Sequence, residues 1–102
     1  MKEKTVENQI KKCLSVMGKN VWFFKHAAGA QMKVGIPDII ACICGHFVGI
    51  EVKQANGHQS DAQKVCEKNI LEAGGEYWLV FSFDEFLEKF KEFSRRLKNE
   101  EI

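Results

Sequence analysis

The feature of this sequence that most constrains its fold is a pair of short apolar runs, residues 38–44 and 47–53, with Gly45 and His46 between them. Successive side chains of a strand point to opposite faces, and a glycine between two such runs is typical of a two-residue hairpin turn. We therefore predict that the two runs form an antiparallel hairpin with the Gly-His pair as its turn.

The alternation along the predicted hairpin gives it two unlike faces. One face carries only apolar side chains, and we predict that it belongs to the core: Ile39, Ala41, Ile43, Val48, Ile50 and Val52. The other face carries Asp38, Glu51 and Lys53 at the open end of the hairpin. A register shifted by one residue would send these charges into the core, so the apolar pattern favours this arrangement.

The position of the turn decides which charged residues face each other. If Cys44 pairs with Phe47, Asp38 lies opposite Lys53. Asp38 and Glu51 then lie on a diagonal, roughly 7 to 8 Å apart. At that separation the two carboxylates can share one ion.

Two carboxylates and a lysine at one point suit the hydrolysis of a phosphodiester. The substrate is negatively charged and the reaction adds charge, so a site must supply fixed positive charge and a nucleophile. Carboxylates are suitable ligands for Mg²⁺, which keeps several waters and binds phosphate. Lys53 would lower the pKa of the attacking water or stabilise the developing charge. Singly, each residue is more typical of a solvated strand edge, and only their joint placement favours a site.

This pattern resembles that of the PD-(D/E)XK nuclease superfamily and, within it, the VRR-NUC (virus-type replication and repair nuclease) family. The resemblance extends from about residue 6 to about residue 85. The matching positions are Glu7 on a leading helix, Gly35-Ile36-Pro37-Asp38, Glu51-Val52-Lys53, Gly57 and Gln63. We see no departure from the family pattern at the functional positions.

The resemblance implies a role for each of these functional residues. Asp38 and Glu51 would be ligands of Mg²⁺ or Mn²⁺ together with the Val52 backbone carbonyl. Lys53 would be the catalytic lysine.

Glu7 and Gln63 have competing interpretations. The resemblance implies that Glu7 completes the metal site through water and that Gln63 orients a phosphate, a water or the catalytic lysine. Without the resemblance, Glu7 is an exposed carboxylate beside an apolar helix stripe. Ser60 and Gln63 also form an S-x-x-Q capping box, in which the Gln63 side chain would bond the Ser60 amide instead of a substrate.

The remaining patterns predict the element order α-β-β-β-α-β-α. The predicted elements are a helix at 4–17 closed by Gly18, a strand at 21–25, the hairpin, a helix from the capping box to Gly74-Gly75, a strand at 77–81, and a helix opened by a second capping box, Ser82 and Glu85. We expect residues 1–102 to form a single α/β domain, with a central four-stranded mixed sheet flanked by helices. The resemblance implies a restriction-endonuclease-like core.

Both later helices carry apolar stripes. The first is predicted to bury Ala62, Val65, Cys66, Asn69 or Ile70, and Ala73. The stripe of the last helix comprises Phe83, Phe86, Leu87, Phe90, Phe93 and Leu97. Phe90, Phe93 and Leu97 extend beyond what a four-stranded sheet needs to cover. We therefore predict a homodimer that uses this helix, the leading helix, or both.

The charge distribution favours a polyanionic partner, which we expect to be DNA. Residues 1–35 hold seven lysines against two glutamates, whereas residues 36–102 carry a net charge of −4. Lys25, His26 and Lys33 flank the segment that leads to Asp38, so we predict that they contact DNA phosphates. Residues 26–35 are predicted to form a mobile loop over the site. A solvated helix face explains the lysines nearer the start equally well.

Cysteine and histidine patterns give no metal motif. The four cysteines are scattered without a CxxC pair, so we expect small buried thiols in a reducing compartment, and the three histidines are expected in different loops. No apolar run approaches the roughly 20 residues of a membrane span, and the charged start has no signal-peptide core. These features predict a cytoplasmic protein, and phage or bacterial origin is suspected.

The combined hypothesis is a hydrolase: a Mg²⁺- or Mn²⁺-dependent, structure-selective DNA endonuclease acting on branched DNA such as four-way (Holliday) junctions. One alternative is a non-catalytic nucleic-acid-binding or assembly module with a nuclease-like fold. A nuclease subunit of a restriction system is a third possibility, but it normally needs a recognition domain for which 102 residues leave no room.

Overall fold

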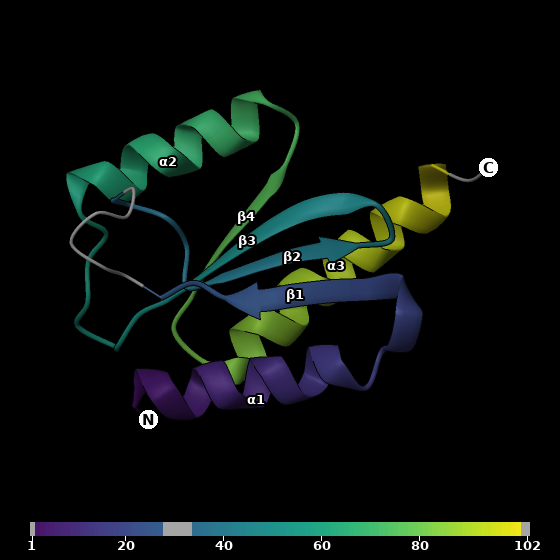
Figure 1. The fold of residues 1–102 in the computed structure, drawn as a ribbon, viewed down its shortest axis with the longest axis horizontal. Coiled ribbons are helices and arrows are strands. Elements are labelled where there is room, and N and C mark those ends of the chain that lie inside the picture. The colour runs from purple at the N-terminus through teal and green to yellow at the C-terminus, as the bar shows by residue number, and fades with distance from the viewer. Residues whose placement is uncertain (1, 28–33, 101–102) are drawn as a thin grey trace.

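The protein forms one four-stranded sheet with helices on both faces (Figure 1). The structure is a computed structural model and describes residues 2–27 and 34–100. Its elements are α1 (Glu3–Ser15), a 3₁₀ turn (Gly18–Asn20), β1 (Val21–Lys25), β2 (Ile39–Ile43), β3 (His46–Val52), α2 (Asp61–Glu72), β4 (Glu76–Val80) and α3 (Phe83–Glu100). The predicted order is confirmed, with the 3₁₀ turn added. Within the described ranges, no helix is long and apolar enough to cross a membrane.

The sheet is mixed, as predicted. Its strand order is β1-β2-β3-β4, with two antiparallel pairings followed by a parallel pairing of β3 with β4. A parallel pairing needs a crossover connection, and α2 supplies it. Helices α1 and α3 cover one face of the sheet, whereas α2 lies over the other face (Figure 1).

The hairpin buries the face that the alternation predicts, but its turn lies one residue earlier than predicted. All six predicted core side chains of the hairpin are 2 % exposed or less. The turn residues are Cys44 and Gly45, whose φ angles of 50° and 83° fit a type I′ turn. Ile43 therefore pairs with His46, and the predicted Cys44–Phe47 pairing is wrong. Each residue of β2 therefore faces a residue of β3 that is two positions from the predicted one. Because side chains alternate along a strand, a shift of two leaves every side chain on its predicted face.

A contact outside the hairpin accounts for the position of the turn. The Cys44 amide donates a hydrogen bond of 2.9 Å to the Asn20 carbonyl, at the point where the 3₁₀ turn leads into β1. This bond holds Cys44 in the left-handed region, which a non-glycine residue rarely adopts. His46 consequently begins β3 and does not lie in a loop, and its ring packs edge-on against Phe93.

Helix α2 begins as predicted but packs less tightly than predicted. Its capping box is present in both directions. None of its residues is buried, and Val65 is 58 % exposed, so the predicted burial of its apolar stripe is wrong. A groove of about 610 Å³ lies between part of α2 and the sheet, and its lining includes Ile36, Ile40 and Phe47. The inner face of α2 has mostly small side chains, which do not fill this space.

Helix α3 is covered more completely than its sequence suggests. Phe86 and Phe93 are buried, and the other stripe residues are half-buried against the core. The indole of Trp78 makes tilted or edge-on contacts with Phe86, Phe90 and Phe93, at centroid distances of 5.6 to 6.2 Å. The premise that Phe90, Phe93 and Leu97 extend beyond the core is therefore wrong.

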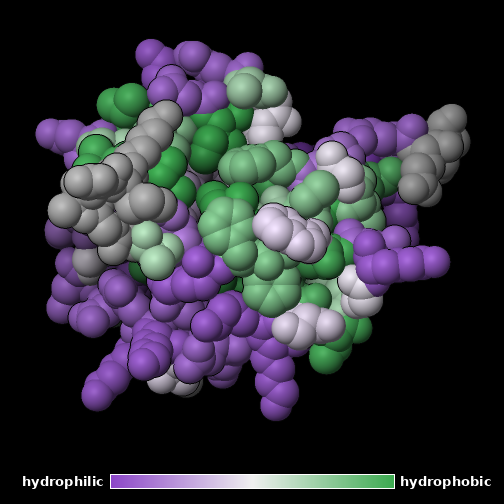
Figure 2. All heavy atoms as spheres, viewed as in Figure 1, coloured by the Kyte–Doolittle hydropathy of each residue, from purple (hydrophilic) through white to green (hydrophobic). Residues whose placement is uncertain are grey.

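The exposed apolar surface lies instead on the sheet face that α2 only partly covers. Trp22 is 65 % exposed, and Phe24 and Phe47 are each 42 % exposed. Figure 2, drawn from the same side as Figure 1, shows hydrophobic side chains gathered over these strands. Cys42 and Cys44 are also exposed, so the prediction of buried thiols is wrong for these two residues.

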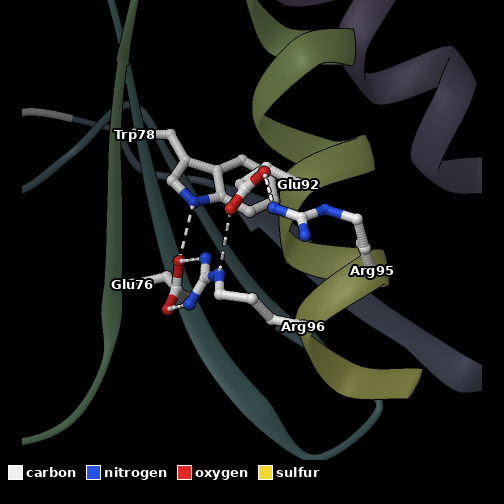
Figure 3. Close-up of polar contacts among 5 residues, drawn as sticks. All are labelled: Glu76, Trp78, Glu92, Arg95 and Arg96. Carbon is white, nitrogen blue, oxygen red and sulfur yellow. Dashed lines mark hydrogen bonds and ion pairs between the residues drawn. The ribbon is translucent and has the colours of Figure 1, made fainter. Parts of the chain in front are cut away.

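An ion-pair network joins the start of β4 to the end of α3 (Figure 3). Arg96 donates two hydrogen bonds, of 2.9 and 3.1 Å, to the two oxygens of Glu76, and the Trp78 indole donates a third of 3.2 Å. The pKa of Glu76 is lowered from its ordinary value of 4.5, chiefly because Arg96 donates to the carboxylate. The positive charge of Arg96 therefore stabilises the folded state through this pair only while Glu76 is ionised.

We expect Arg96→Ala to lower the free energy of unfolding at pH 7 by ~1 kcal/mol, since solvent screens this partly exposed pair. This difference in unfolding free energy should shrink as the pH falls below 4.5 towards the lowered pKa of Glu76 and past it. The reason is that protonation of Glu76 removes the interaction from the wild type as well. Arg95→Ala is the matched control and should change little. Urea unfolding at several pH values tests this, and a pH-independent difference would contradict it.

Candidate active site

Tight backbone packing fixes the segment that leads to Asp38. Gly35 has a φ of +84°, and a Cβ atom there would lie 2.4 Å from the Ala62 carbonyl oxygen. Gly49 lies under Pro37 in the same way, since a Cβ atom on it would be 2.8 Å from Pro37 Cγ. A side chain at Gly35 would push this segment away from α2, and a side chain at Gly49 would push it away from β3. The glycines therefore set the position of Asp38 at the start of β2.

The Asp38 carboxylate is held by the neighbouring strand. Its Oδ2 accepts a hydrogen bond of 2.8 Å from the Val52 amide. Its backbone carbonyl accepts a hydrogen bond from the His26 amide, which extends the β1–β2 pairing by one step. Ile39 pairs with Ile50, so the next pair along the hairpin would be Asp38 and Glu51. The predicted pairing of Asp38 with Lys53 is wrong because of the turn position.

Glu51 is the only buried charged residue among those that the structure describes, with 1 % exposure. Burial raises its pKa, and a hydrogen bond with Asp38 and the charge of Asp38 raise it further, to about 8. The charges of Lys53 and Lys25 act in the opposite direction. The acidic pair therefore converges, with both lysines near enough to influence it.

Gln63 closes the predicted capping box and also contacts the acidic pair, by a bond to Glu51 that the sequence analysis did not predict. Its Oε1 accepts a hydrogen bond of 2.8 Å from the Ser60 amide, which closes the capping box. Its Nε2 donates a hydrogen bond of 2.9 Å to Glu51 Oε2. One side chain thus joins the first turn of α2 to the buried carboxylate on β3.

Glu7 reaches the site through a lysine. The Lys25 ammonium lies 2.5 Å from Glu7 Oε1 and 3.6 Å from Asp38 Oδ1. Burial alone would lower the pKa of Lys25, but the hydrogen bond to Glu7 and the charges of Glu7 and Asp38 outweigh it and raise the pKa. The sequence analysis missed this pairing, although Val21, Phe23 and Lys25 share the strand face that α1 covers.

The remaining predicted site residues lie around this centre. Lys53 directly follows β3, is half-buried, and donates its backbone amide to the Val80 carbonyl at 3.0 Å. His26 follows β1, where its backbone bonds Asp38. Lys33 and most of the predicted loop at 26–35 lie outside the described residues.

The donor set fits a hard divalent cation. Two adjacent carboxyl groups, one of them buried, repel each other when both are ionised, and a cation between them removes that cost. Among residues 2–27 and 34–100, no group of three His, Cys, Asp or Glu side chains is placed to bind a metal. One or two carboxylates with several waters are, however, typical of Mg²⁺ sites.

Comparison with known proteins finds similarity at the level of the three-dimensional fold. No protein-family model matches the sequence, and no curated protein is significantly similar to it. A solved structure described as "VRR_NUC domain" matches with a TM-score of 0.72 and 20 % identity, over 87 % of this chain and 94 % of that one. A "VRR_NUC domain protein" matches with a TM-score of 0.69 and 17 % identity, over 89 % and 86 %. The chain has the fold of a VRR_NUC domain.

The resemblance stated from the sequence is thus confirmed at the level of the fold. The VRR_NUC-like α/β architecture comprises the four-stranded mixed sheet and its flanking helices, as predicted. Among the motif residues that carried the resemblance, Glu51 contacts both Asp38 and Gln63 in this fold.

The dual contact of Gln63 predicts two separable effects. Ser60→Ala and Gln63→Ala should each lower the free energy of unfolding by ~1 kcal/mol, because each removes half of the capping box. Only Gln63→Ala should weaken Mn²⁺ binding, by roughly tenfold, because it leaves Glu51 without its amide partner. Isothermal titration calorimetry measures the second effect. Equal weakening in both variants would show that Gln63 acts only as a cap.

Proposed function

We propose that this chain is a Mg²⁺- or Mn²⁺-dependent endonuclease that hydrolyses phosphodiester bonds in DNA, with branched DNA such as four-way (Holliday) junctions as its preferred substrate. The observation that carries the proposal is the contact between buried Glu51 and Asp38, with Lys53 beside them. Two adjacent carboxyl groups, one of them buried, are costly to keep ionised without a cation, and groups perturbed in this way are typical of functional sites. The similarity in fold to two VRR_NUC domain structures supports the same proposal.

Each residue at the site would have a defined task. Asp38 and Glu51 would hold the ion, with the Val52 carbonyl as a third ligand. A bound ion of this kind polarises the phosphate and lowers the pKa of a coordinated water. Lys53 would place a point charge where negative charge develops. Gln63 keeps Glu51 in its orientation, and Glu7 would contribute through water.

DNA is the expected partner because the leading third of the chain is basic. Lys25, His26 and Lys33 would contact phosphates near the site, and this remains a prediction. A cytoplasmic setting, in a bacterium or a phage-infected cell, also remains a prediction.

A panel of labelled linear, flapped and four-way DNA substrates tests the activity with Mg²⁺, Mn²⁺ or EDTA. We expect cleavage with either ion, none with EDTA, and the highest rate on four-way DNA. Asp38→Asn, Glu51→Gln and Lys53→Met should each lower the rate by at least ~10²-fold, since each removes a charge that the transition state requires. Glu76→Gln, a carboxylate change in the β4–α3 network, is the control and should cleave normally.

The outcomes of this panel separate the possible readings. Full activity in any of the three site variants would remove that residue from the mechanism. DNA binding by the wild type without cleavage under any condition would favour the alternative of a non-catalytic nucleic-acid-binding module.

We further propose that the protein is a homodimer, with an interface other than the one the sequence suggested. The α3 stripe is covered within one chain, whereas Trp22, Phe24 and Phe47 are exposed on one face of the sheet (Figure 2). Contiguous exposed aromatic side chains are typical of an interface. A second copy on this face would present two sites to two strands of a branched substrate.

Sedimentation velocity at micromolar concentration should show a dimer for the wild type and a monomer for Trp22→Glu. The reason is that a carboxylate at the centre of an apolar interface loses its solvation without gaining a partner. Val16→Glu is the matched control, because Val16 is 79 % exposed and lies outside the sheet face. A monomeric wild type would contradict the proposal.

A further inference from the structure

A cationic side chain of this protein already occupies the carboxylates that a metal would need. The Lys25 ammonium bridges two carboxylates from separate elements, Glu7 on α1 and Asp38 at the start of β2. The other oxygen of Asp38 is engaged by the Val52 amide. Both oxygens of Asp38 therefore already have a partner, and Oδ1 is the oxygen at which a metal would meet the Lys25 ammonium.

The charges around Asp38 make this competition strong. A divalent ion and an ammonium group repel each other, and both are attracted to the same carboxylates. The side chains of Glu7 and Asp38 are 12 % and 27 % exposed, so water screens these interactions less than it does on an open surface. A metal bound at Asp38 is thus disfavoured while the Lys25 ammonium remains in place.

Lys25 also has room to leave. Its side chain is 39 % exposed and sits on a flexible four-carbon stem at the end of an edge strand. The strand order places β1 at the edge of the sheet. A DNA phosphate is a suitable new partner for the displaced ammonium.

We propose that Lys25 is an internal cation that competes with the divalent metal for Glu7 and Asp38, and that metal loading transfers its ammonium to a DNA phosphate. This inference rests on the proposed function, because it assumes the metal and DNA. It makes Lys25 a positioning residue that links the two binding events. By thermodynamic linkage, DNA that attracts the ammonium also favours metal binding.

Metal binding without DNA tests the first half of the proposal. Calorimetric titration with Mn²⁺ should give Lys25→Met an affinity at least about fivefold tighter than the wild type, a gain that structural damage would not produce. Lys25→Arg retains the cation and should not gain affinity. Lys12→Met removes an equal charge from the exposed side of α1 and corrects for the general effect of net charge. Unchanged or weaker Mn²⁺ binding by Lys25→Met would overturn the proposal.

DNA binding tests the second half. Fluorescence anisotropy with a labelled four-way DNA should show nearly equal affinities of the wild type and Lys25→Met in EDTA, because the ammonium is then paired within the protein. With Ca²⁺, and with the DNA checked intact on a gel, Lys25→Met should bind several-fold more weakly. An equal loss in EDTA and in Ca²⁺ would overturn the transfer to phosphate.

The same titrations distinguish a failure of this inference from a failure of the proposed function. If neither the wild type nor Lys25→Met binds Mn²⁺, the metal-dependent activity itself is contradicted. If the wild type binds Mn²⁺ and Lys25→Met binds it no more tightly, only the role of Lys25 is contradicted. Circular dichroism of each variant verifies that the fold is retained.

Discussion

The cost of burying Glu51 is the constraint on which the arrangement of this protein depends. A carboxyl group withdrawn from water beside a second carboxyl group is stable only if it is protonated, hydrogen-bonded or neutralised. In this protein Gln63 and Asp38 are hydrogen-bonded to Glu51, and the charges of Lys53 and Lys25 oppose its negative charge. The core beneath, by contrast, is built from ordinary aliphatic and aromatic side chains. The fold can therefore be understood as a rigid frame that holds one unfavourable group in place.

That frame draws on elements from the whole length of the chain. Helix α1 contributes Glu7, the edge strand β1 contributes Lys25, the hairpin contributes the acidic pair, and the first turn of α2 contributes Gln63. The two glycines that let the backbone approach closely, Gly35 and Gly49, bring the segment before β2 against α2 and β3. The same close contacts that pack the segment before β2 against its neighbours also position the carboxylates.

Much of this arrangement could be predicted, because it follows from patterns among residues that are close together in the sequence. The alternation of residues 38–53 identified the buried face of the hairpin, and the capping box at Ser60 and Gln63 identified the start of α2. The turn was placed one residue too late, since the bond from the Cys44 amide to Asn20 comes from a distant segment. Because of this register error, Asp38 was placed opposite Lys53 and not beside Glu51, which it contacts.

The other errors also arise from contacts between distant segments. Periodicity showed that α2 and α3 each have an apolar stripe, but it does not report how closely a helix approaches the sheet. Trp78 and α1 enclose the stripe of α3, whereas a groove lies between part of α2 and the sheet. The pairing of Lys25 likewise joins residues 18 positions apart, beyond the reach of local patterns.

The parallel pairing of β3 with β4 has a consequence for the order in which the protein acquires its site. Glu51 lies beside Leu79 in this pairing, and β4 can join the sheet only after the intervening helix has been made. During translation, the hairpin emerges with its acidic residues still hydrated, and their burial awaits synthesis of the last third of the polypeptide. Assembly of the carboxylate pair is thereby a late event of folding, and a nascent or truncated chain carries Asp38 and Glu51 without the buried environment in which they meet.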